Sequence, residues 1–282
     1  MTRGKAFWLS FGCTLAVLLP LYAAALFFAG AQSGTAAAGE GTGIAVRRPD
    51  ANDSRNLLLE ADGGDGAADF YLLRFDALQG RVCVLALPRE LLAGERGDAR
   101  QTLGGLAAYA GPGLAAARLA ALLEIKIDHY LRLDKSELTA LGARMGNVSL
   151  DLATAECRPL GALASAAADG RAVLSAAAAN ALLARSGAGA QALAPLRARL
   201  LSGFLQAGMA DLHTLLPDYL RGDASRFDTD ILATDLYDYE RILSYLALRL
   251  PEMRWAAADG TAAAGGCRLT DAARAQAQDW FT

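Results

Sequence analysis

The chain has 282 residues, of which 54% are hydrophobic and 20% charged, so it is long and apolar enough for one large folded domain or two small ones. Its formal net charge is −3, and this balance excludes the basic face that a nucleic-acid-binding protein requires. We therefore expect no nucleic acid among its partners.

The N-terminal segment, residues 6–29, contains no charged residue. As a helix rising ~1.5 Å per residue it would be ~36 Å long, enough to cross a hydrocarbon core of ~30 Å. Basic residues precede it at Arg3 and Lys5. The positive-inside rule therefore predicts residues 1–5 in the cytoplasm, a transmembrane anchor at 6–29 and the remainder on the extracellular face of the cell membrane. A cleaved signal peptide is the alternative, because Ala29-Gly30-Ala31 fits a cleavage site.

Residues 30–55 are rich in Gly, Ala, Ser and Thr, a composition typical of a linker, and they lead to a predicted domain at 56–282. The domain opens with three short apolar runs, Asn56–Leu59, Phe70–Phe75 and Val82–Leu87, separated by turn residues. Runs of this kind predict strands that are covered on both faces. Polar residues collect at their ends: Asp62, Asp65, Asp69, Arg89 and Glu90. Acids and an arginine at strand ends are what a site for a metal-bound phosphate needs.

The rest of the chain alternates between helical and strand patterns. Helices are predicted at 115–124, 136–145, 171–185, 193–208, 211–220, 236–250 and 271–281, and strands at 127–133, 148–152 and 253–256. This order predicts an α/β domain in which helices sandwich a central mixed β-sheet.

Five segments, taken in order, resemble a known family. They are NLLLEADGG, ADFYLLRFDALQGRVCVLALPREL, AYAGPG, LLEIKIDHYLRLDKSEL and MGNVSLDL. Together they resemble the LytR–CpsA–Psr proteins, which are membrane-anchored bacterial enzymes, over about residues 56–260.

The resemblance implies a transferase that moves a glycopolymer from a polyprenyl pyrophosphate carrier onto peptidoglycan. In such a protein arginines hold the pyrophosphate, a divalent cation such as Mg²⁺ joins it to aspartates, and a hydrophobic cleft takes the prenyl chain. Carried over, it implies a catalytic group of Arg89, Asp62 and Asp69, with Asp62 and Asp69 as metal ligands. It also implies substrate-binding roles for Arg185, Arg197, Arg199 and Glu90. We further expect a long apolar cavity that opens near Arg89 and has the ~300–1,000 Å³ typical of ligand pockets.

The sequence also departs from the family pattern. Glu90 stands where the family has aspartate, and Ala67-Ala68 stand where it usually shows an arginine. The region around Arg197 lacks an acid and an Arg-Gln pair that the family carries. The alternative is therefore a catalytically degenerate relative that binds wall polymer or lipid carrier, or acts as a scaffold; an unrelated exported α/β domain is a third reading. If none of the downstream arginines converges with Arg89 near Asp62 and Asp69, the degenerate reading is favoured.

Overall fold

The computed structural model describes residues 47–62, 68–94, 102–151, 154–155, 157, 170–185, 190–222 and 227–282, without the side chains of 184, 185 and 190. Residues Arg48–Thr282 form one compact unit. The predicted anchor at 6–29 and most of the predicted linker lie outside the described residues. Within the described part of the chain, no helix combines the length and the apolarity needed to cross a membrane.

A six-stranded mixed sheet forms the centre of the domain, in the order β7-β4-β1-β2-β3-β8. The strands are β1 (Ser54–Asp62), β2 (Asp69–Asp76), β3 (Arg81–Leu87), β4 (His129–Asp134), β7 (Asp228–Thr229) and β8 (Glu252–Ala257). Strand β2 runs antiparallel to its neighbours β1 and β3, whereas β4 lies parallel to β1 and β8 parallel to β3. The prediction of a central mixed sheet is confirmed.

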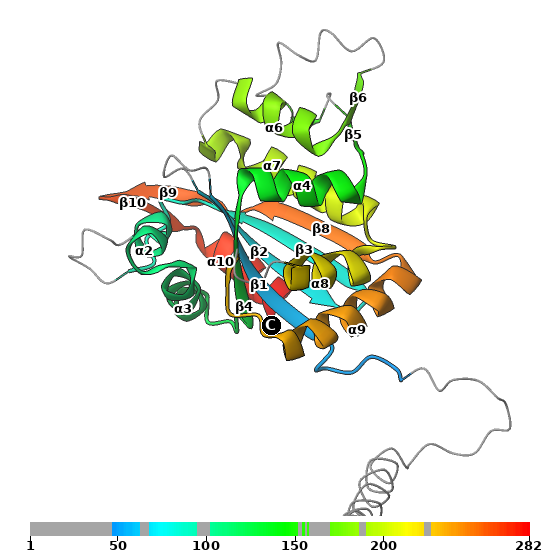
Figure 1. The fold of residues 1–282 in the computed structure, drawn as a ribbon. Coiled ribbons are helices and arrows are strands. Elements are labelled where there is room, and N and C mark those ends of the chain that lie inside the picture. Colours follow the sequence, from blue (N-terminus) through cyan, green and yellow to red (C-terminus); the bar gives the residue numbers. More distant parts are fainter. Residues whose placement is uncertain are drawn as a thin grey trace, which may run out of the picture. The chain divides into compact units, whose positions relative to one another are not determined.

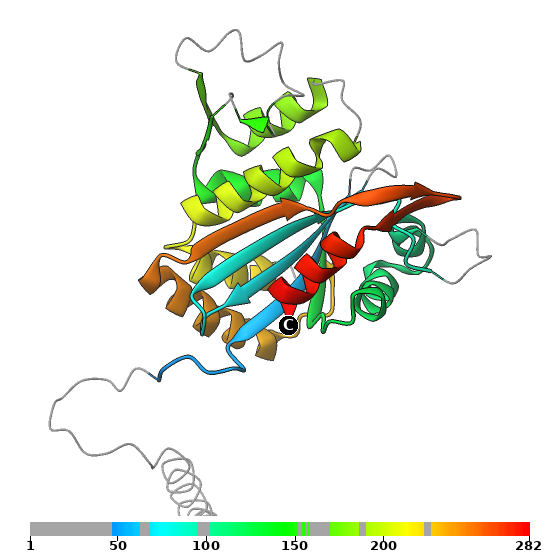
Figure 2. The same cartoon turned by 180° about the vertical axis from the view of Figure 1, so that it is seen from behind.

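Helices cover both faces of this sheet (Figures 1 and 2). One face carries α4 (Lys135–Met145), α6 (Ala176–Arg185), α7 (Ala190–Ala207), α8 (Leu212–Gly222) and α9 (Ala233–Arg249); the other carries α2 (Leu103–Ala110), α3 (Pro112–Leu123) and α10 (Asp271–Phe281). Alternate residues of β1 enter different cores: Leu57 and Leu59 pack under the first set of helices, Leu58 under the second. Since both faces are buried, the strands read as continuous apolar runs.

Several elements differ from the sequence prediction, which also did not include the short edge strand β7. The helix predicted at 171–185 is wrong over its first residues, because β6 (Arg171–Leu174) pairs with β5 (Val148–Asp151) before α6 begins. Helix α2 and the hairpin of β9 (Gly260–Ala263) and β10 (Gly266–Leu269) were not predicted. In the first case tertiary pairing overrides the high helix propensity of an Ala-rich segment.

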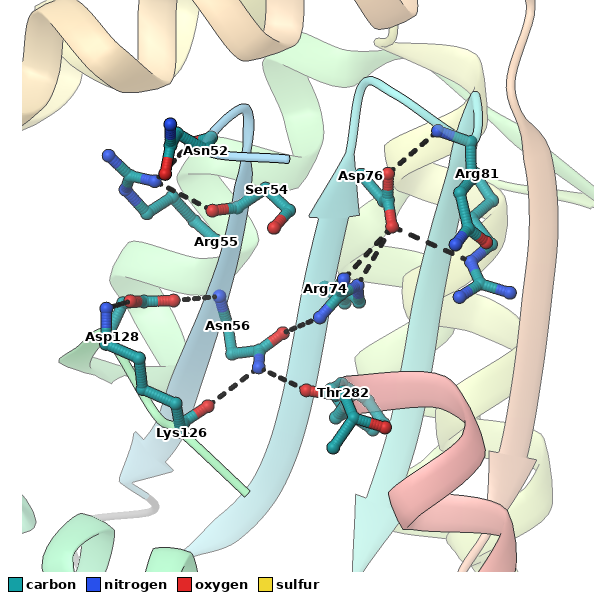
Figure 3. Close-up of polar contacts among 12 residues, drawn as sticks. Asn52, Ser54, Arg55, Asn56, Arg74, Asp76, Arg81, Lys126, Asp128 and Thr282 are labelled. Atoms are coloured by element: carbon teal, nitrogen blue, oxygen red, sulfur yellow. Dashed lines mark hydrogen bonds and ion pairs between the residues drawn. The ribbon is translucent and has the colours of Figure 1, made fainter. Parts of the chain in front are cut away.

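The two ends of the sheet are built differently. At one end, the tether end, the chain enters β1, β2 turns into β3, and α9 passes into β8. Buried polar groups hold this region together (Figure 3): Arg74 donates to Asp76 at 3.1 Å and to Asn56 at 3.3 Å. The Asn56 amide in turn donates to the carbonyls of Lys126 and Phe281, both at 2.7 Å. These bonds attach α10 to the sheet. We call the opposite end of the sheet, where β1 and β3 finish and β2 begins, the site end.

Candidate functional site

A polar pocket lies at the site end, where β1 and β3 finish and β2 begins. It is lined by Asp69 at the start of β2, by Arg89 and Glu90 after β3, by the first turns of α7 with Arg197, and by Asp259 after β8. The remaining lining residues are mostly apolar or uncharged: Phe70, Tyr71, Ala86, Leu87, Pro88, Gln191, Ala194, Pro195, Ala257 and Ala258. The N-terminal end of a helix favours anions, so the beginning of α7 adds to the positive potential of the two arginines.

Asp69 and Arg197 form an ion pair inside this pocket. Their side chains are only 18% and 17% exposed. Burial raises the pKa of the Asp69 carboxyl, while Arg197, Lys135 and Arg89 act in the opposite direction. Within the described residues, Nε of Arg197 is buried without a hydrogen-bond partner. A guanidinium with one unsatisfied donor, beside a carboxylate whose charged form is disfavoured by burial, is suited to bind a phosphate oxygen.

The backbone around Arg89 is fixed from two sides. The Arg89 carbonyl accepts from the Gly104 amide at 2.9 Å, and the Glu90 carbonyl accepts from the Cys267 amide at 2.8 Å. The first donor belongs to the N-terminal turn of α2, whose amides have no partner inside the helix, and the second to β10. A Cβ added at Gly266 would overlap the Glu90 carbonyl oxygen, so β10 approaches this closely only because Gly266 has no side chain. These contacts hold the turn and leave the Arg89 side chain 37% exposed, 3.6 Å from Glu90.

An apolar cavity of about 100 Å³ adjoins the pocket, between the sheet and helices α4, α6, α7 and α8. This is several times the ~10–15 Å³ that one water requires. Its lining is almost entirely Leu, Ala, Phe and Met, with Thr139, Asn180 and Arg197 as the strongly polar members. Arg197 and Tyr71 line both the cavity and the polar pocket. The two spaces therefore meet at Arg197, next to the pocket that contains Arg89. The cavity is smaller than the ~300–1,000 Å³ expected for a prenyl cleft.

The structure does not bring every predicted site residue into the pocket. Asp62 is the last residue of β1. Its neighbour Ala61 pairs with Asp69 and faces the cavity side of the sheet. Because side chains alternate along a strand, Asp62 faces the other side. It does not line the pocket. Arg199 stacks on the ring of Trp255 at 5.6 Å instead. Arg185 ends α6, and its side chain is outside the described part of the structure.

Sequence reasoning missed two pocket residues, Asp259 and Gln191. Asp259 follows the predicted strand at 253–256, but only the parallel pairing of β8 with β3 brings it beside Arg89. No local signal marks that pairing. The N-terminal turn of α7 with Gln191 was likewise hidden, because the predicted helix began later.

The fit of a divalent cation is partial. Among the described residues, no three His, Cys, Asp or Glu side chains are grouped to hold a metal ion. Of the two predicted ligands only Asp69 lines the pocket, and it is paired with Arg197. Mg²⁺ commonly binds through one or two carboxylates together with substrate phosphates. Asp69 is therefore compatible with a cation that arrives on the substrate, but not with one held by the protein alone.

Comparison with known proteins bears on the fold. No protein-family model and no curated protein sequence matches the chain. Solved structures do match: a protein of Eubacterium siraeum named as a transcription regulator has a TM-score of 0.68 at 15% identity, over 87% of this chain and 98% of that one. TagT of B. subtilis has a TM-score of 0.58 at 13% identity, over 87% and 98% of the two chains. TagT bound to LI-WTA gives 0.60 at 13% identity, over 88% and 98%. TagV of B. subtilis also matches, and the chain therefore has the fold of TagT and TagV, the LytR–CpsA–Psr fold that the sequence resemblance implied.

Proposed function

We propose that this chain is a membrane-anchored transferase of the LytR–CpsA–Psr type, acting outside the cell membrane, which moves a glycopolymer from a polyprenyl pyrophosphate carrier to peptidoglycan. The observation that carries the proposal is the position of Arg197. It lies at once in the apolar cavity, in the polar pocket with Arg89, and in an ion pair with Asp69. A molecule that joins a long apolar chain to a pyrophosphate matches this arrangement.

The pocket supplies recognition for both parts of the substrate. Arg89 and Arg197 each present a planar fork that binds phosphate oxygens bidentately. The apolar cavity removes prenyl surface from water, a gain of ~25 cal/mol per Å². The fold of TagT, which has been solved bound to LI-WTA and to LIIa-WTA, supports a carrier-linked wall polymer as the substrate class.

The chemistry follows from these groups. An acceptor hydroxyl oxygen forms a bond to the phosphorus that carries the polymer, and the bond from that phosphorus to the prenyl phosphate breaks. The hydroxyl proton passes to Asp69, whose raised pKa makes it a stronger base than a solvated aspartate. Arg89 and Arg197 neutralise the charge on the departing prenyl phosphate. A Mg²⁺ ion bound through the phosphates and Asp69 would add to this neutralisation.

The experiment is a transfer assay with the full chain, a polyprenyl pyrophosphate-linked glycan and peptidoglycan, with and without Mg²⁺. We expect polymer on peptidoglycan and release of polyprenyl phosphate. If the chain binds the carrier but neither product forms, the catalytic proposal fails and the binding or scaffold reading takes its place.

A further inference from the structure

Three exposed leucines gather at the tether end of the sheet, which the proposed reaction does not use. Leu78, in the turn between β2 and β3, is 49% exposed, and Leu248 and Leu250, at the end of α9, are 78% and 86% exposed. The backbone joins these places, because the Glu252 amide, just after Leu250, donates to the Gly80 carbonyl at 2.9 Å. We call Leu78, Leu248 and Leu250 the tether-end leucines.

Leu250 is held in an unfavourable backbone conformation. Its φ is 49° and its ψ is 81°, in the left-handed region that glycine or asparagine adopts more readily. A leucine that is both strained and exposed gains nothing for the isolated domain. The left-handed conformation is itself a common helix ending, and Glu124 at the end of α3 adopts it too, so it is the exposure of the leucine that calls for a partner.

The charged side chains described at the tether end are of two kinds, paired and unpaired. Three acids at this end have basic partners: Asp53 pairs with Arg241, Asp238 with Arg55, and Glu252 with Arg254. By contrast, Arg48 and Arg249 are exposed and have no ion pair among the described residues. Arg249 stands between Leu248 and Leu250 in the sequence, and Arg48 lies in the segment that leads into β1. Exposed leucines and arginines at one end of the sheet suit an anionic lipid surface.

The chain enters the domain at this end. Residues 48–55 approach the sheet alongside α9, as Figures 1 and 2 show and as the ion pairs of Asp53 and Arg55 require. The uncharged segment 6–29 lies shortly before them in the sequence. We propose that the tether-end leucines, with Arg48 and Arg249, form a face that rests on the lipid headgroups of the membrane.

The direction of the apolar cavity agrees with a membrane at the tether end. Tyr71, Leu73 and Phe75 of β2 all line it, so it follows the strand from the site end towards the tether end. β1 spans nine residues, which at ~3.3 Å per residue separates the two ends by ~30 Å. This step rests on the proposed function, as does the use of segment 6–29 as an anchor: a carrier whose phosphate binds at Arg197 has its prenyl chain directed back towards the lipid face.

The test uses the full chain, with Cys13→Ser as background because Cys83, Cys157 and Cys267 are buried. A bimane label is placed at Leu248→Cys, Leu250→Cys or Leu78→Cys, and the protein is reconstituted in phosphatidylcholine–phosphatidylglycerol vesicles with or without doxyl-labelled lipid. Val173→Cys is the matched control, since Val173 is 70% exposed. Its strand, β6, lies beyond α4 and α7 as seen from the central sheet (Figure 1).

We expect doxyl lipid to quench the three tether-end labels several-fold more than the Val173 label. We also expect Arg249→Glu to reduce quenching at Leu78→Cys when phosphatidylglycerol is present. Equal quenching at all four positions, or a chain that does not float with the vesicles, overturns the proposal. Neither result depends on transferase activity, so the transfer assay fails or succeeds separately.

Discussion

Replacing Arg197 by alanine tests the residue on which the pocket and the cavity converge. The change removes the guanidinium that pairs with Asp69 and lines both spaces. A hydrogen bond to a charged group contributes ~1.5–3 kcal/mol, so the loss should weaken pyrophosphate binding ~10- to 150-fold. Arg197→Lys should recover only part of the affinity, because an ammonium cannot form the bidentate contact.

Titration calorimetry with inorganic pyrophosphate measures this affinity, and urea unfolding of the same variants reports stability. Arg199→Ala is the matched control, two residues along the same helix, where the guanidinium stacks on Trp255 at 5.6 Å and not in the pocket. We expect Arg199→Ala to bind pyrophosphate like the wild type. Equal losses in the two variants, or none in Arg197→Ala while the fold is intact, would refute the assignment of phosphate binding to Arg197.

Three further outcomes follow from contacts in the domain. Gly266→Ala should push β10 away from Glu90 and weaken pyrophosphate binding at least several-fold in calorimetry. Unchanged affinity would show that the contact between β10 and Glu90 does not position Arg89. Asp69→Asn should raise the pyrophosphate affinity measured without Mg²⁺, because the Asp69 carboxylate no longer competes with phosphate for Arg197. The same variant should transfer less polymer, and unchanged or higher transfer activity would contradict the role of Asp69 as base. Burial raises the pKa of Glu60 above 4.5, with Arg132 opposing, so this carboxyl's contribution to stability is lost as pH rises from 4.5 through the raised value. Glu60→Gln should flatten that part of the pH profile in urea unfolding, and an unchanged slope would contradict it.

The strands of the sheet could be predicted because their signal is local. Leu57, Leu58 and Leu59 are all buried although they alternate between two cores, and a run of apolar residues is the direct consequence. Helix α2 could not be predicted, since its sequence LGGLAAYA contains two glycines that disfavour a helix. It forms because Thr102 caps it and its first amides bind the carbonyls of Arg89 and Leu91.

The candidate site was predictable only in part. Asp69 and Arg89 stand at strand ends, and a shared sheet edge follows from adjacent strands. The ion pair of Asp69 with Arg197 joins residues 128 positions apart, so it depends on how α7 packs across β3 and β8. Asp62 illustrates the reverse case: it is close to Asp69 in sequence, but strand alternation directs it to the other side of the sheet.

The central claim, that this chain transfers polymer from a prenyl pyrophosphate, is tested most directly by one single-turnover measurement. Full-length protein is mixed with a radiolabelled polyprenyl pyrophosphate-linked glycan and peptidoglycan, and the label is followed into the insoluble wall fraction. The wild type should transfer the label, and Arg89→Ala should reduce the transfer strongly while the fold is retained. Label that stays on the carrier with the wild type, although the carrier is bound, would contradict the account.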